Sequence, residues 1–377
     1  MIDRRLVWIS SQPTPYNDFL FRAIAEEVRV FEVWYRKPGS TSHPWKTPLG
    51  QGYRHRAFRP MFGADWKLIF EAIRRRDTFF MVAGWIEPTQ QILLTAIRLL
   101  GRDFAMWTDT PNLTKRRGRV QAWLRSCWLK WLFRGAKAVL GTGKPGVEAL
   151  EQMGVPTGRA VAFPFVLDLN AYRRTDWSFD RSRPMQFISS GRLLNRQKGH
   201  DLAIRALARA SQETGQSFEY FIAGTGPDLR EIIDLAKRLG VGERVTCGGW
   251  VEPTELVDRM KSAHVLIHSS PTHDPFPNAI LEGMAAGMVV LGSDASGSAR
   301  DRIISGTNGF VHAAGDEKQL CQQIVWCFQN QAELGRLGRA AEATANQWPV
   351  TRSIAILQGL LDPLVSAAGR ESGNSTS

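Results

Sequence analysis

Apolar residues follow two alternating patterns along the chain. Runs such as "RLVWIS" (5–10) and "TFFMVAGW" (78–85) are nearly continuous in apolar residues, which is typical of short buried strands. Between such runs, segments 15–27 and 89–101 mix apolar and polar residues as helices do. The repeated alternation of strand and helix predicts an α/β protein built on parallel sheet.

A second alternating series follows a break in the pattern. Residues 168–184 lack periodicity, and strand-like runs then resume from "QFISSG" (186–191) to "MVVLGS" (288–293). The sequence therefore predicts two doubly wound, Rossmann-like domains with a cleft between them, where ligands bind beyond the carboxyl ends of the strands. The expected division is 1–170 for an N-terminal acceptor-side domain, 171–350 for a donor-binding domain, and 351–377 for a C-terminal helix and disordered tail.

Composition narrows the class of protein. The chain has 377 residues, of which 43% are hydrophobic and 22% charged, as in folded globular proteins. The four cysteines form no CxxC pair, so neither a zinc site nor a disulfide framework is expected. The apolar run at the N-terminus is too short and too polar for a signal peptide or a membrane span. We therefore expect a cytoplasmic protein with reduced thiols.

The net charge of +12 lies in the first half of the chain. Residues 1–170 contain 26 Lys and Arg against 14 Asp and Glu, whereas residues 171–377 contain 22 of each class. No acidic residue occurs between Asp109 and Glu148. This asymmetry separates a basic domain from an electrically balanced one.

Tryptophan and basic residues occur together in residues 113–133. A helical wheel predicts an apolar stripe of Leu124, Cys127, Trp128 and Trp131. One interpretation is a helix packed on this stripe with a solvated basic face. The other is a helix that binds an anionic membrane surface or acceptor. The residues expected to make that contact are Arg116, Arg117, Arg119, Trp123, Lys130 and Arg134.

Three glycine-containing loops and one short helix in the second half suggest an anion site. "SSGRLLNRQKG" (189–199) places Arg192 and Lys198 in one loop between a strand and a helix. Two fixed cations at such a position suit a diphosphate, although the loop is also compatible with a solvated charged turn. "DPFPNAILEGMAAG" (274–287) begins a helix whose first N–H groups lack partners and bind anions.

The order of these motifs resembles the GT-B glycosyltransferases of the family 4 type. The motifs are GR-x5-KG, GxGP, a GW-x-E loop and P-F-P-N-x-x-L-E, and the resemblance covers residues 186–312. Members of this family are retaining enzymes that use nucleotide-activated sugars. The resemblance thus implies a hexosyltransferase that moves a sugar from a nucleotide diphosphate sugar to a lipid-linked or cell-surface polysaccharide acceptor.

The resemblance also implies roles for particular residues. Arg192 and Lys198 match the pair that holds the donor diphosphate, and Glu282 matches the acid that binds the ribose hydroxyls. Asp274 replaces the usual glutamate beside the donor sugar, and its alternative role is a charge or a cap at the helix N-terminus. Other donor contacts are expected at Gly191, Gly224, Gly226, Pro277, Asn278 and Ala279.

No D-x-D motif occurs in the chain, so neither a metal nor another cofactor is expected. Asp109 follows a predicted strand about where relatives carry an acidic or histidine active-site residue, and a turn-capping role is its alternative. We expect peripheral attachment to the inner face of the cell membrane and no nucleic-acid binding. The alternatives are a sugar-nucleotide epimerase or hydrolase of the same fold, and a non-catalytic membrane- or polyanion-binding relative.

Overall fold

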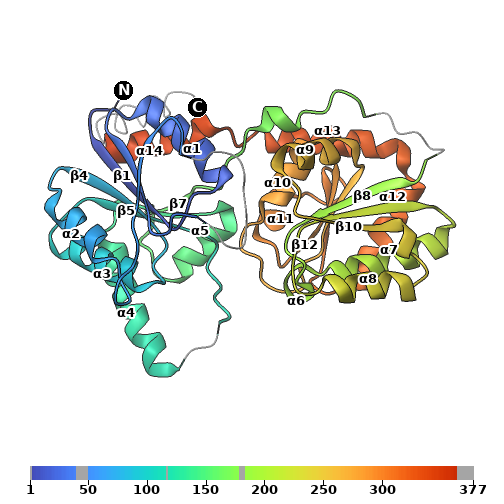
Figure 1. Cartoon of the computed structure of the whole chain (residues 1–377), viewed down its shortest axis with the longest axis horizontal. Coiled ribbons are helices and arrows are strands. Elements are labelled where there is room, and N and C mark those ends of the chain that lie inside the picture. Colours follow the sequence, from blue (N-terminus) through green and yellow to red (C-terminus); the bar gives the residue numbers. More distant parts are fainter. Residues whose placement is uncertain (1, 40–49, 116–117, 178–182, 363–377) are drawn as a thin grey trace, which may run out of the picture. The chain divides into compact units, whose positions relative to one another are not determined.

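The computed structural model describes residues 2–39, 50–115, 118–177 and 183–362, which form two α/β units (Figure 1). Unit 1 comprises Met1–Leu167 together with Pro349–Ser377, and unit 2 comprises Asp168–Trp348. The predicted fold class, two doubly wound α/β domains, is confirmed. The residues after 350 were expected to form a separate C-terminal piece, whereas the structure assigns their helix to unit 1.

Unit 1 contains a parallel sheet of seven strands in the order β3-β2-β1-β4-β5-β6-β7. Its strands are β1 (Arg5–Ser10), β2 (Phe31–Tyr35), β3 (Arg54–Ala57), β4 (Thr78–Ala83), β5 (Phe104–Thr108), β6 (Val139–Gly141) and β7 (Ala160–Ala162). Its helices are α1 (Pro15–Glu27), α2 (Trp66–Arg74), α3 (Pro88–Leu99), α4 (Arg119–Gly135), α5 (Gly143–Gln152) and α14 (Val350–Leu361).

Successive residues of β1 enter different cores on the two faces of this sheet. Val7 and Ile9 pack in one core with residues of α2, α3 and α4. Leu6 and Trp8 pack in the other with residues of α1 and α14. Because side chains alternate along a strand and helices cover both faces, every position must be apolar. This explains why the buried strands were visible as continuous hydrophobic runs.

Two elements of unit 1 escaped the sequence analysis. Strand β3, with the sequence RHRA, is exposed along its whole length at the edge of the sheet. Its charged residues suit an edge strand but carry no hydrophobic pattern. Helix α2 begins at the N-cap Asp65, whose side chain accepts a hydrogen bond from the backbone N–H of Leu68.

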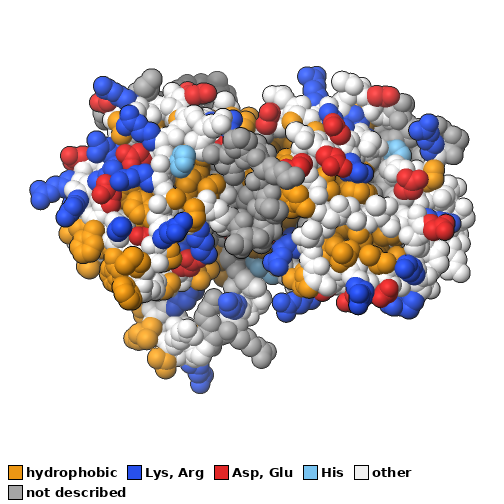
Figure 2. All heavy atoms as spheres, viewed as in Figure 1, with side chains coloured by type: hydrophobic (Ala, Val, Ile, Leu, Met, Phe, Trp, Pro, Cys, Tyr) orange, Lys and Arg blue, Asp and Glu red, His pale blue; other side chains and the backbone are white. Residues whose placement is uncertain are grey.

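The apolar stripe predicted for the basic helix is half right, because Trp128 and Trp131 are partly buried and pack against the core, whereas Leu124 and Cys127 do not. In α4 the buried side chains are Leu129, Leu132 and Phe133. Leu124 is 55% exposed and Cys127 is also exposed. The first half of the helix extends away from the sheet, and Figure 2 shows basic and hydrophobic side chains together at its free end. A helical wheel assumes one buried face along the full length, and α4 has such a face only in its second half.

Helix α14 completes the second core of unit 1. Its Leu357 and Leu361 lie in the same core as Trp8 and Phe21. The guanidinium of Arg4 donates a hydrogen bond of 3.5 Å to the carbonyl oxygen of Leu361. The last described helix therefore returns to the unit in which the chain begins.

Unit 2 contains a parallel sheet of six strands in the order β10-β9-β8-β11-β12-β13. Its strands are β8 (Met185–Ser190), β9 (Phe218–Ala223), β10 (Val245–Gly249), β11 (Val265–His268), β12 (Val289–Ser293) and β13 (Gly309–His312). Its α-helices are α6 (Asn195–Lys198), α7 (His200–Thr214), α8 (Leu229–Arg238), α9 (Pro253–Ser262), α10 (Asn278–Ala285), α11 (Gly297–Arg302), α12 (Glu317–Gln329) and α13 (Gln331–Ala345), and the 3-10 helices are η1 (Leu169–Tyr172) and η2 (Gly242–Arg244).

In the portion of the chain that the structure describes, no helix combines the length and hydrophobicity needed to span a bilayer.

One matched pair of substitutions on α4 tests the corrected packing of this helix. Leu132→Ala removes a fully buried side chain and should lower the free energy of unfolding of unit 1 by about 2–5 kcal/mol. Leu124→Ala, the same change at an exposed position, should stay within about 0.5 kcal/mol of wild type. Urea unfolding followed by tryptophan fluorescence measures both. An equal loss of unfolding free energy in both variants would contradict the burial of Leu132 and the exposure of Leu124.

Candidate functional site

The candidate site lies at the carboxyl ends of the parallel strands of unit 2, where open sheets bind ligands. The loop after β8 leads into the short helix α6, which ends at Lys198. Gly199 follows with φ of +66°, and a Cβ atom there would lie 2.2 Å from the carbonyl oxygen of Ser269. Only glycine fits this conformation and this close approach. The turn fixes Lys198 beside the end of β11.

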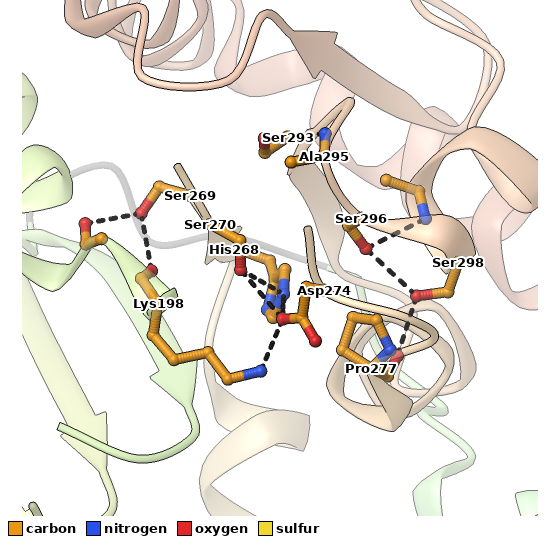
Figure 3. A network of polar contacts seen from close by, with 12 residues as sticks. Lys198, His268, Ser269, Ser270, Asp274, Pro277, Ser293, Ala295, Ser296 and Ser298 are labelled. Atoms are coloured by element: carbon orange, nitrogen blue, oxygen red, sulfur yellow. Dashed lines mark hydrogen bonds and ion pairs between the residues drawn. The ribbon is translucent and has the colours of Figure 1, made fainter. Parts of the chain in front are cut away.

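The carboxylate of Asp274 is the centre of a buried polar network (Figure 3). Its Oδ2 atom lies 2.5 Å from Nζ of Lys198 and 2.9 Å from Nε2 of His268. The hydroxyl of Ser270 donates a third hydrogen bond of 2.9 Å to the same oxygen. Asp274 is only 5% exposed, so these three donors replace the water that the carboxylate loses.

The network sets the charge of its members. Burial alone would raise the pKa of Asp274, but hydrogen bonding by His268 and the positive charge of Lys198 outweigh it and hold the pKa far below its ordinary value. Burial lowers the pKa of His268 despite the nearby carboxylate. At neutral pH the carboxylate is therefore ionised, and the imidazole is neutral. A neutral imidazole protonated at Nε2 donates to Oδ2 as the distance requires.

Asp274 does not cap the helix that follows it. Helix α10 begins at Asn278, and its N-cap residue is Pro277, with no hydrogen bond from a side chain. The backbone of Asp274 instead forms a β-bridge with Ser296. Its N–H donates to the carbonyl oxygen of Ala295, and its carbonyl oxygen accepts from the N–H of Gly297. The capping alternative is thereby wrong. In Figure 3 the second carboxylate oxygen points away from the three donors described above.

Glu282 lies within α10 and is 3% exposed, so it is not a solvated surface acid. At the start of the same helix, Ser298 donates a hydrogen bond of 2.9 Å to the carbonyl oxygen of Pro277, which fixes the entry turn. The first N–H groups of α10, at Asn278 and Ala279, have no intrahelical acceptor by the geometry of any helix. The segment 274–282 thus contains two buried acids and one helix N-terminus.

The glycine loops lie against one another through their backbones. A Cβ atom at Gly224 would be 1.9 Å from the carbonyl oxygen of Gly191, and one at Gly226 would be 2.2 Å from that of Leu193. These glycines are therefore required by packing between two loops at adjacent strand ends. The side chain of Arg192 is exposed, while its carbonyl oxygen contacts Nε2 of His200 at 3.1 Å.

The remaining candidates belong to unit 1. Asp109 is exposed and directly follows β5. Arg119, Trp123, Lys130 and Arg134 are exposed on α4, as the membrane interpretation requires. The other two residues predicted for that contact, Arg116 and Arg117, lie outside the described residues.

Sequence reasoning brought Lys198 and Asp274 into one site but missed His268 and Ser270. Both follow from the segment "HVLIHSS" (264–270), in which three polar residues end an apolar strand. A polar cluster at the carboxyl end of a predicted parallel strand could have identified both residues, because ligands bind at such ends. Among the described residues, no group of three or more His, Cys, Asp or Glu has the geometry to hold a metal ion.

Part of unit 2 is similar to a known family of sequences. Residues 176–344 match the family model for glycosyl transferases group 1. The lipopolysaccharide 1,6-galactosyltransferase of Salmonella typhimurium is 30% identical over 139 residues, which are 36% of this chain and 37% of that protein. LpsE of Rhizobium meliloti, a lipopolysaccharide core biosynthesis glycosyltransferase, is 31% identical over 137 residues, 36% of this chain and 37% of that protein. The matched segments thus span little more than a third of these relatives.

Comparison with solved structures extends over nearly the whole chain. HepE of Anabaena, in complex with UDP and glucose, has a TM-score of 0.75 at 18% identity, covering 96% of this chain and 100% of that one. The apo form of the lipopolysaccharide outer core galactosyltransferase WaaB has a TM-score of 0.70 at 14% identity, covering 95% of this chain and 99% of that one. These matches confirm that the fold is of the GT-B class.

Removing the central carboxylate should destabilise unit 2. Asp274→Ala leaves the Lys198 ammonium, whose side chain is 16% exposed, without its counter-charge, and should cost about 3–5 kcal/mol. The matched control is Asp258→Ala, because Asp258 pairs with Lys261 on the surface and its side chain is 77% exposed. This control should change stability by less than about 0.5 kcal/mol. Thermal unfolding of both variants is the measurement, and an unaltered Asp274→Ala protein would refute the buried network.

Proposed function

We propose, from the glycosyl transferases group 1 domain that residues 176–344 form, that the whole chain is a glycosyltransferase using a nucleotide diphosphate sugar. The observation that carries the proposal is the grouping of a lysine, two buried acids and a helix N-terminus at the strand ends of unit 2. A diphosphate needs cations and N–H groups, and a sugar needs carboxylates that accept hydrogen bonds from hydroxyls.

Lys198 suits the donor diphosphate while it remains paired with Asp274. An ammonium group has three N–H donors, and Asp274 uses one of them. The remaining donors are free to bind phosphate oxygens, and the ion pair holds the flexible side chain in one position. Together with Arg192 and the N-terminus of α10, Lys198 stabilises the charge that develops on the leaving nucleoside diphosphate. In this scheme no metal ion is needed.

The two acids bind the two sugar rings of the donor, the ribose and the transferred sugar. Glu282 accepts hydrogen bonds from the ribose hydroxyls, and the outward oxygen of Asp274 accepts one from the donor sugar. The family resemblance supports transfer with retention at the anomeric carbon, in which the leaving phosphate helps to take the acceptor proton. Asp109 in unit 1 positions the acceptor hydroxyl or takes its proton.

The proposed acceptor is a lipid-linked or cell-surface glycan at the inner face of the membrane. The names of the relatives from Salmonella typhimurium and Rhizobium meliloti, which concern lipopolysaccharide, support this class. The exposed side chains of α4 support the location, because Trp123 is 64% exposed and Arg119, Lys130 and Arg134 are exposed on the same helix. An indole ring suits the headgroup layer, and the arginines and lysine suit anionic lipids.

Two competing functions give different experimental results. A hydrolase or epimerase would release or convert the donor sugar without any acceptor. A non-catalytic relative would bind a nucleoside diphosphate but transfer no sugar to a membrane extract. A screen of UDP-, GDP- and ADP-sugars with and without extract separates the three functions. UDP-sugars come first, since HepE was solved with UDP and glucose.

The exposed arginine of the diphosphate loop provides the test of the donor site. Arg192→Ala should reduce kcat about 100- to 1000-fold, because one charge that stabilises the transition state is lost. Its thermal stability should not change, since the side chain is exposed. Arg196→Ala is the matched control, since Arg196 is an exposed arginine of the adjoining helix α6, and this variant should keep its rate within about threefold. Turnover and melting temperature are measured together.

Lys198→Ala complements this experiment. It should also lose most turnover, but with a lower melting temperature because Asp274 loses its counter-charge. Near-wild-type turnover in both Arg192→Ala and Lys198→Ala would reject the donor site.

Membrane attachment is tested by flotation with vesicles. The triple variant Arg119→Gln, Lys130→Gln, Arg134→Gln should bind vesicles containing anionic lipid about a hundredfold more weakly, at about 1 kcal/mol per charge. The control removes three exposed charges from α8 of unit 2, by Arg230→Gln, Lys237→Gln and Arg238→Gln. It should bind as the wild type does. If the wild-type protein does not bind these vesicles at low salt, the membrane proposal fails.

A further inference from the structure

Helix α11 ends at a buried arginine whose side chain makes no ordinary hydrogen bond. Arg302 is 2% exposed, and its Nε, Nη1 and Nη2 atoms all lack a hydrogen-bond partner within the described ranges of the chain. The acid paired with it is its neighbour Asp301, whose Oδ2 atom lies 4.0 Å from Nε. Burial lowers the pKa of Arg302 to about 10, so the guanidinium is charged at neutral pH. The proposed function makes no use of this side chain.

Aromatic rings take the place of hydrogen-bond acceptors around this guanidinium. Its central carbon, Cζ, lies over the ring of Phe276 at 4.8 Å from the ring centroid, and 6.0 Å from that of Trp348. A cation over the face of an aromatic ring is attracted by the quadrupole of the ring, most strongly where water is excluded. Phe276 is itself only 4% exposed. The contact between Arg302 and Phe276 is therefore a desolvated cation–π interaction.

Stability alone does not account for a cation at position 302. A second buried arginine of unit 2, Arg174, shows the usual arrangement, because its Nη2 donates to the carbonyl oxygens of Met260 and Ala263 at the end of α9. A buried charge without such acceptors is costly, and a well-packed apolar side chain of similar volume is often at least as stable. The role of Arg302 is therefore to be sought in what its guanidinium contacts.

The contacts of α11 converge on the turn that enters α10, residues 274–277. Ser298 and Arg302 are four positions apart and so share one face of α11. The hydroxyl of Ser298 donates to the carbonyl oxygen of Pro277 at 2.9 Å (Figure 3), and the guanidinium of Arg302 lies over the ring of Phe276. One face of α11 thus holds two successive residues of the turn.

This turn sets the direction of the first N–H groups of α10. Asn278 and Ala279 follow Pro277 directly, and their N–H groups have no intrahelical acceptor. In the proposed function these groups bind the donor diphosphate. Phe276 is the buried side chain of the turn next to Pro277, so a displacement of its ring would redirect the N–H groups that follow.

We propose that Arg302 is a positioning residue of the donor site, whose cation–π contact with Phe276 holds the entry turn of α10 in the orientation that receives a nucleoside diphosphate. The inference rests on the proposed function for the identity of the ligand. The guanidinium nitrogens of Arg302 are closed to solvent, so Arg302 touches no ligand and acts through Phe276.

The test compares the binding of UDP, GDP and ADP with that of uridine, guanosine and adenosine, by ligand-observed NMR titration of the full chain. In Arg302→Met, the nucleoside diphosphate that binds the wild-type protein should bind at least about tenfold more weakly. Its nucleoside should bind within about threefold of wild type, because the N–H groups of α10 contact the diphosphate. A general loss of folded protein would weaken both ligands equally.

A double-mutant cycle with Phe276 tests the path of the effect. Phe276→Leu removes the ring but keeps a buried apolar side chain, and should weaken diphosphate binding about as much as Arg302→Met does. The double variant should lose no more than either single variant, because both changes remove the same contact. Additive losses would overturn the proposal. Should Arg302→Met fail to fold, Phe276→Leu decides alone, and unchanged diphosphate binding there overturns the proposal.

Arg174→Met is the matched control, since it is the same substitution at another buried arginine of unit 2. It should lower the melting temperature, because the carbonyl oxygen of Met260 loses its donor, and keep diphosphate affinity within about threefold. Wild-type diphosphate binding by Arg302→Met, or an equal loss of the nucleoside, rejects the role of Arg302 alone. If no nucleoside diphosphate binds the wild-type protein, the glycosyltransferase function fails, and this inference fails with it.

Discussion

The three hydrogen bonds to Oδ2 of Asp274 connect the parts of unit 2 that form its site. Lys198 is the last residue of α6, His268 is the last residue of β11, and Ser270 follows that strand. Asp274 itself begins the segment that enters α10. A buried carboxylate must satisfy its hydrogen bonds within the protein, so it forces these segments into one arrangement. The same bonds orient the lysine, so the donor chemistry proposed for it depends on the order of this network.

Much of the fold was accessible from hydrophobic patterns, and the exceptions have a physical cause. Strands such as β1 are buried on both faces and leave a continuous apolar signal. Strand β3 lies at an edge with exposed charged residues, so its sequence resembles a loop. In α4 the pattern indicated a helix, but the predicted stripe held only for Trp128 and Trp131, because only the second half of the helix packs against the core. Burial of a helix depends on its tertiary neighbours, which periodicity does not contain.

The candidate site was predicted as motifs, and its internal connections were not. Arg192, Lys198, Asp274 and Glu282 were identified from spacing and resemblance, and the structure shows that Lys198 and Asp274 pair directly. His268 was overlooked, since it ends an apolar strand and no local spacing links it to Asp274.

The return of α14 to unit 1 has a consequence for synthesis on the ribosome. Unit 2 is one uninterrupted stretch of chain, whereas the core around Trp8 and Phe21 also requires Leu357 and Leu361. Domains fold as units while the chain emerges from its N-terminus. Synthesis of unit 1 therefore begins first, but its core can be completed only after all of unit 2 has been translated. In the interval the apolar side chains of α1 and β1 that Leu357 and Leu361 cover stay open to water.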